Sequence, residues 1–140
     1  MAGKRMGITH TTVAVRSIAD RKKPWKAVFL VASGVSVSMV PANVLRRLGV
    51  RAIRRDRYEL ADGTIAELDV GAALLTVKGI TVANEVAFVP DDSEPLLGAP
   101  ALQSANLVWD ARREELVPAQ RLKPLKCARC VEVLAGLSAP

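Results

Sequence analysis

Turn-forming residues interrupt this chain at short, regular intervals, and their spacing limits the folds that 140 residues can adopt. Segments rich in Val, Ile, Leu and Thr lie between the turns, for example residues 7–17 and 54–60. Short strands with turn signals about every 8–12 residues are typical of an all-β barrel or sandwich. The pairs Asp62-Gly63 and Lys78-Gly79 each lie between two such segments and therefore predict β-hairpins.

Two short helices are predicted within this β pattern. Pro41 suits the first turn of a helix, and Gly49 is a typical residue just after a helix end. Pro100 can begin a second short helix that extends to about Ala105. A chain of this length has room for one domain with a real hydrophobic core and little room for a second.

Composition and charge exclude some classes of protein. The longest apolar candidate, residues 27–35, is interrupted by Ser33 and Gly34, and a membrane-spanning helix needs about 20 apolar residues. Lys4 and Arg5 are not followed by the apolar stretch of a secretory signal. We therefore expect a cytoplasmic protein without a membrane partner.

The formal net charge is +6, and part of it comes from a cluster of arginines. The cluster is Arg46, Arg47, Arg51, Arg54, Arg55 and Arg57. Such a cluster could bind the phosphates of a nucleic acid, which stays open as an alternative function. The favoured interpretation is a solvated helix end followed by the outer face of a strand, because no aromatic stacking residues are interleaved.

The composition changes at Pro118, so we divide the chain into a domain over residues 1–118 and a tail over residues 119–140. The tail contains Cys127 and Cys130 in the order Cys-Ala-Arg-Cys. Such a pair can be a redox site or half of a zinc site, and two copies of the chain could together supply four thiolates. The only histidine, His10, is distant in sequence. We favour structural thiols and expect no metal site.

Three segments together resemble the retropepsin-like aspartic proteases. Residues 29–41, Phe-Leu-Val-Ala-Ser-Gly-Val-Ser-Val-Ser-Met-Val-Pro, are similar to the active-site segment, where an apolar strand leads into Asp-Thr/Ser-Gly-Ala/Ser. Residues 94–102 resemble the apolar-apolar-Gly segment and the short helix behind that loop. Residues 58–64 lie between the two, where the family has its flap hairpin. The order and spacing agree over about residues 8–118.

The resemblance implies an all-β, retropepsin-like barrel with one or two short helices and one lobe per chain. It also implies a homodimer that acts on a peptide or protein substrate at a site on its twofold axis, without a cofactor. In the active-site loop, Ser33 and Gly34 match the family pattern. The implied substrate-binding residues are Val35, Asp62, Gly63, Ile65, Leu97 and Gly98.

Ala32 departs from the family pattern, because it stands where the resemblance implies the catalytic aspartate. A methyl group can neither activate water nor share a proton with a second carboxylate. The expected function is therefore an aspartic endopeptidase that is inactive with this sequence. We favour an engineered Asp-to-Ala knockout, because the surrounding motif is intact. A natural, catalytically dead peptide-binding or dimerisation module is the alternative.

Overall fold

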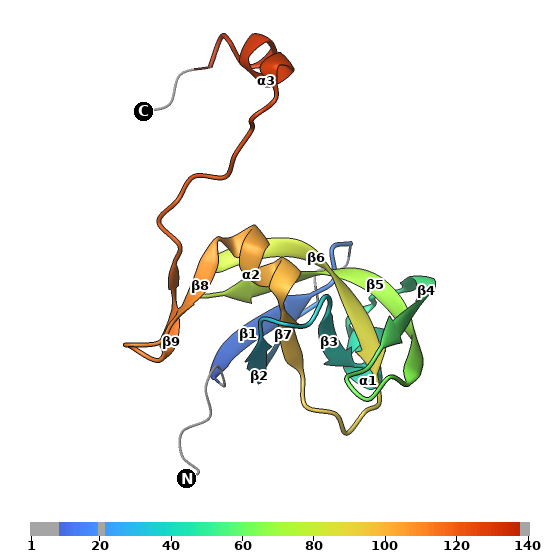
Figure 1. Ribbon diagram of the computed structural model, residues 1–140. Coiled ribbons are helices and arrows are strands. Elements are labelled where there is room, and N and C mark those ends of the chain that lie inside the picture. Colours follow the sequence, from blue (N-terminus) through green and yellow to red (C-terminus); the bar gives the residue numbers. More distant parts are fainter. Residues whose placement is uncertain (1–8, 20–21, 138–140) are drawn as a thin grey trace.

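The computed structural model describes residues 9–19 and 22–137 (Figure 1). Its strands are β1 (His10–Arg16), β2 (Trp25–Ala32), β3 (Ser38–Pro41), β4 (Ala52–Glu59), β5 (Ile65–Val77), β6 (Ile80–Val89), β7 (Leu96–Gly98), β8 (Leu107–Asp110) and β9 (Glu115–Pro118). Its helices are α1 (Ala42–Leu48), α2 (Ala99–Ala105) and α3 (Ala128–Val133). The part of the first predicted strand before residue 9 lies outside the described residues.

The strands form a closed barrel. The hydrogen-bonded order is β1-β2-β7-β3-β6-β5, and β5 pairs with β1 to close the ring. β4 adds to the outer edge of β5, and β8 and β9 form a separate hairpin. Most pairs are antiparallel, but β2 runs parallel to β7 and β3 runs parallel to β6. The predicted all-β, retropepsin-like barrel with few short helices is confirmed.

The barrel encloses one apolar core. Phe29, Leu45, Leu75 and Leu97 are its largest fully buried apolar side chains. The predicted limits of α1 are confirmed, because Pro41 precedes the helix and Gly49 ends it with φ of 90°. The nearly all-apolar end of residues 25–31 predicts a strand buried on both faces, and this is wrong, because Val28 is 57% exposed. Only one face of β2 packs into the barrel.

β5 is a single strand of 13 residues, although its sequence predicts two shorter strands, residues 65–70 and 74–78. Gly71 does not interrupt it. A Cβ atom at position 71 would lie 2.5 Å from the carbonyl oxygen of Arg51, so the glycine allows the start of β4 to approach. The β4–β5 pairing shifts register at the same place, between Ala52 and Arg54. The glycine therefore marks a close backbone approach rather than a turn.

The tail leaves the barrel after β9 and carries α3 well away from it (Figure 1). Within residues 119–137, the contacts with the domain come from the first residues of the tail. The Asn106 side chain donates to the Arg121 carbonyl over 2.9 Å, and Lys123 Nζ donates to the Ser104 carbonyl over 2.6 Å. The sequence did not predict α3 as a helix. None of the helices in the described part of the chain is long and apolar enough to cross a membrane.

Candidate functional site

The loop of residues 32–34 begins where β2 ends. In the parallel pair of β2 and β7, Val31 lies opposite Leu97 and Ala32 lies opposite Gly98. Ala32 is half-buried, and the next two residues are exposed. The loop turns back at once, because the Val35 N–H donates to the Ala32 carbonyl over 3.1 Å. The residue at position 32 is therefore held by regular strand pairing at the rim of the barrel.

Gly98 and Ser38 fix this loop from behind. The Gly98 N–H donates to Ser38 Oγ over 2.9 Å, and Ser38 is only 1% exposed. The Ala99 N–H donates to the Val35 carbonyl over 2.8 Å. A Cβ atom at position 98 would lie 2.8 Å from the carbonyl carbon and oxygen of Val37. The loop backbone therefore lies directly against β7 at Gly98. A side chain at position 98 would push the loop away from β7.

A groove of about 650 Å³ lies between this loop and the β4–β5 hairpin. Residues 34–37 form one wall, and Tyr58, Ala66 and Leu68 of the hairpin form the other. Burial raises the pKa of the Tyr58 phenol, so this side chain is neutral near pH 7. The exposed lining is mostly apolar. The groove therefore suits a ligand segment with apolar side chains.

The predicted substrate-binding residues are only partly brought together. Val35 lines the groove and Gly98 supports its floor. Leu97 is fully buried in the core and is not among the residues that line the groove, so its role in substrate binding stays a prediction. Asp62 and Gly63 lie at the exposed tip of the hairpin, and Ile65 is 52% exposed beside them.

Side-chain alternation along β5 explains the position of Ile65. Neighbouring residues of a strand point to opposite faces, so Ala66 and Leu68 face the groove while Ile65 shares the outer face with Glu67 and Asp69. Tyr58, Ala66 and Leu68 line the groove but were not among the substrate-binding residues predicted from the sequence. Counting alternate positions back from buried Val70 would have found the last two.

The hairpin tip is held by local hydrogen bonds. Asp62 Oδ1 accepts from the Thr64 N–H over 3.0 Å and from Thr64 Oγ1 over 2.7 Å. Gly63 adopts φ of 88°, which favours glycine. The hydrogen bonds from Thr64 lower the pKa of the Asp62 carboxyl. They therefore stabilise the tip fully above the usual aspartate pKa of about 3.9, and this contribution is lost as pH falls through the lowered pKa.

Replacing Asp62 with alanine is expected to loosen the tip. The Thr64 amide loses its acceptor, so its hydrogen exchange should become roughly fivefold faster. Hydrogen exchange at neutral pH measures the effect, with Asp92→Ala in the 90–94 loop as the control. Without ligand, the tip of the unaltered chain should exchange faster than residues 29–31 of β2. Slower exchange at the tip would contradict a mobile flap.

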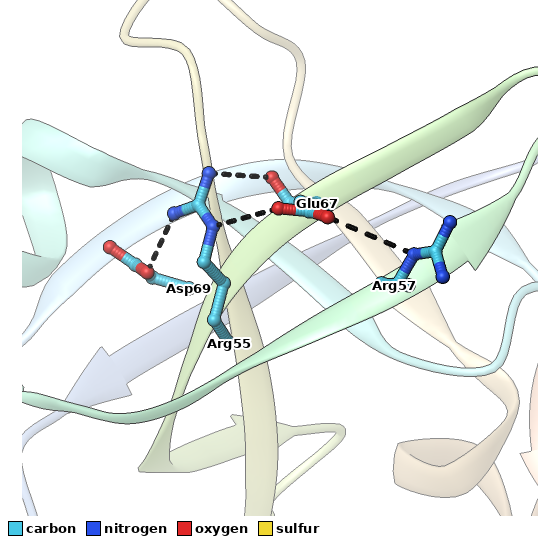
Figure 2. A network of polar contacts seen from close by, with 4 residues as sticks. All are labelled: Arg55, Arg57, Glu67 and Asp69. Carbon is cyan, nitrogen blue, oxygen red and sulfur yellow. Dashed lines mark hydrogen bonds and ion pairs between the residues drawn. The ribbon is translucent and has the colours of Figure 1, made fainter.

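The arginines of β4 are engaged in ion pairs on both faces of the hairpin. On one face, Arg55 lies 3.0 Å from Asp69 and 3.5 Å from Glu67, and Arg57 reaches the same glutamate over 3.8 Å (Figure 2). On the other face, Arg54 lies 2.7 Å from a Glu85 oxygen. This arginine lowers the pKa of the Glu85 carboxyl, which stays ionised.

These ion pairs fit the favoured interpretation of the arginine cluster as the outer face of a strand. The side chains of Arg54, Arg55 and Arg57 already form ion pairs with carboxylates. They are therefore less free to contact phosphates. Charged residues also protect β4, the edge strand of the sheet, from pairing with other strands.

The two cysteines lie in the tail at the beginning of α3, the helix that Figure 1 shows away from the barrel. Both are free thiols, and the Cys130 N–H donates to the Cys127 sulfur over 3.2 Å. Hydrogen bonds from the Cys130 side chain and backbone lower the pKa of the Cys127 thiol. Within residues 9–19 and 22–137, no group of three or more His, Cys, Asp or Glu side chains is placed to hold a metal ion.

The barrel, the loop at the end of β2 and the overlying hairpin define a retropepsin-like lobe. Solved retroviral proteases are similar to it. The simian foamy virus (mac) protease is 22% identical, and the match covers 68% of this chain and 92% of the viral protein with a TM-score of 0.50. The EIAV protease complexed with the inhibitor HBY-793 is 18% identical, with 74% and 92% covered and a TM-score of 0.48.

At these identities the similarity to the foamy virus protease concerns the fold alone. The sequence matches no protein-family model and no curated protein. Function therefore has to be argued from the residues of the groove and the loop.

Proposed function

We propose that this chain is one half of a homodimeric, retropepsin-type aspartic endopeptidase, and that Ala32 in place of the catalytic aspartate leaves it able to bind peptides but not to cleave them. The domain that performs this function comprises residues 1–118. The observation that carries the proposal is the apolar groove between the loop of residues 32–34 and the β4–β5 hairpin. An extended peptide with apolar side chains fits the chemistry of that groove.

The proposed reaction needs two carboxylates that share one proton. Two like charges a few ångströms apart cannot both ionise cheaply, so one carboxylate acts as the base that activates water while the other acts as the acid. A single lobe supplies one such position, at the end of β2. The second has to come from a twofold-related copy. With alanine in both copies, no group can take the proton from water.

Ser33 supports the dimer part of the proposal. This residue is exposed at the end of β2. It lies beside position 32, so its hydroxyl is available to bond to the same loop of a second copy. The residue also borders a second cavity of about 740 Å³, formed with α2, β8 and the beginning of the tail.

Replacing Leu68 with asparagine is expected to weaken peptide binding about tenfold. Leu68 lines the groove, and losing its apolar contact with a bound side chain costs about 1.5 kcal/mol. Fluorescence anisotropy with labelled peptides that carry apolar residues at alternate positions measures the change. Ile65→Asn is the matched control, because Ile65 lies on the same strand outside the groove lining.

Equal weakening by the two substitutions would contradict peptide binding in this groove. The unfolding transition of each variant has to be measured in parallel, so that a loss of folded protein is not mistaken for a loss of binding.

A further inference from the structure

The tail presents two thiols as one chelating pair. Cys127 and Cys130 have the two-residue spacing of structural zinc sites. The turn that carries both residues is closed by the Cys130 N–H, which donates to the Cys127 sulfur over 3.2 Å. The Cys127 sulfur thus folds back over the turn that carries Cys130, and neither thiol is joined in a disulfide.

One chain cannot complete the coordination of such an ion. A structural zinc site has four protein ligands, and the described residues bring no third His, Cys, Asp or Glu to this pair. We propose that two copies of the tail bind one thiophilic divalent ion of the Zn²⁺ class, each through Cys127 and Cys130. On binding, the ion displaces four thiol protons, which pass to the buffer, and four metal–sulfur bonds form.

The charges of the tail suit this centre. Four thiolates around a divalent cation leave an excess of negative charge, which needs nearby cations. In each copy Lys126 precedes the first cysteine, Arg129 lies between the two cysteines, and Lys123 lies three residues before Lys126. Glu132 is the only acidic residue between residues 119 and 137. Two tails can therefore approach one ZnS₄ centre with their basic side chains close to it.

The exposed apolar residues of the tail also favour association with a second copy of the tail. Several are more than half exposed because α3 lies away from the barrel. These residues are Leu122, Leu125, Val131, Val133 and Leu137. When a metal ion joins two tails, the apolar residues of one tail can cover those of the other. Metal binding and apolar burial therefore both favour a dimer of tails. The inference does not depend on catalysis in the barrel.

The test is a titration of the full-length, reduced, metal-free protein with Co²⁺. Bound Co²⁺ reports thiolate ligands by a charge-transfer absorption band and tetrahedral geometry by its visible absorption bands. The expected result is saturation at one Co²⁺ per two chains, followed by displacement with Zn²⁺. Cys127→Ser and Cys130→Ser should each lose the charge-transfer band and at least about 100-fold in Co²⁺ affinity, since altering even an outer-shell partner costs 10–100-fold. Ala128→Ser, in the same turn with both thiols kept, is the matched control.

Absence of thiolate bands, saturation at one ion per chain, or full affinity in either cysteine variant would overturn the proposal. Sedimentation with a chelator separates this site from the barrel. If the chelated protein still forms dimers and binds peptides while the titration fails, only the metal site is refuted. If the cobalt bands appear but the metal-loaded protein binds no peptide, the proposed function is refuted and the metal site stands.

Discussion

Replacing Ala32 with aspartate is expected to give this chain peptidase activity. The β2–β7 pairing, the Gly98 backbone and the hydrogen bond to the Ala32 carbonyl fix the position of residue 32 without using its side chain. A carboxylate introduced there lies on the exposed rim of the barrel, beside the apolar groove. Because an acid–base pair contributes about 100-fold or more, cleavage of an apolar peptide library should rise by at least that factor over the alanine form.

The pH dependence of the Ala32→Asp variant distinguishes a carboxylate pair from a single carboxylate. Two aspartates facing each other across the twofold axis share one proton, so activity should follow a bell-shaped curve whose limbs belong to the pair. Above the upper limb both carboxylates ionise, and their repulsion should also weaken the dimer. Sedimentation across the same pH range measures the second effect.

Ala32→Asn is the matched control for this experiment. Asparagine has nearly the shape of aspartate but cannot act as an acid or a base, so it should leave the chain inactive. A folded, dimeric Ala32→Asp variant that cleaves no peptide from acidic to mildly alkaline pH would contradict the proposed endopeptidase. A peptide-binding module would then be the better account of the groove.

The β-rich fold could be predicted because its turns carry local signals. Turns and helix ends are set by residues whose backbone preferences act within a few positions. Examples are Asp62-Gly63, Lys78-Gly79, and the Pro41 and Gly49 that border α1. β3 was missed because it is only four residues long and follows the loop directly. Its pairing with β6 joins segments that are distant in sequence, and no local signal reports such a contact.

The candidate site was harder to predict, because hydrophobicity does not say which face of a strand a residue occupies. Leu97 and Ile65 are both apolar, yet one is fully buried and the other lies on the outer face of the hairpin. Gly98 was correctly expected behind the loop, but the sequence could not reveal Ser38 as its hydrogen-bond partner. That contact spans 60 residues and depends on the barrel being closed.

Replacing Gly98 with alanine is expected to destabilise the barrel and the loop together. Gly98 has φ of −90°, which alanine adopts freely, so the effect is steric rather than conformational. The added Cβ would lie 2.8 Å from the Val37 carbonyl atoms and 2.9 Å from the Val35 oxygen. These are backbone atoms that cannot rotate away. Overpacking of this kind costs about 1–3 kcal/mol, which chemical denaturation with urea measures as a fall in the free energy of unfolding.

Gly34→Ala is the control, because a Cβ atom at position 34 meets nothing within 4 Å. It should change the free energy of unfolding by no more than about 0.5 kcal/mol. In the Ala32→Asp background, Gly98→Ala should also reduce cleavage, since the Val35 carbonyl that it displaces holds the loop against Ala99. Equal stability of the two alanine variants would mean that the loop does not rest on β7. The support proposed for the residue at position 32 would then have to lie elsewhere in the barrel.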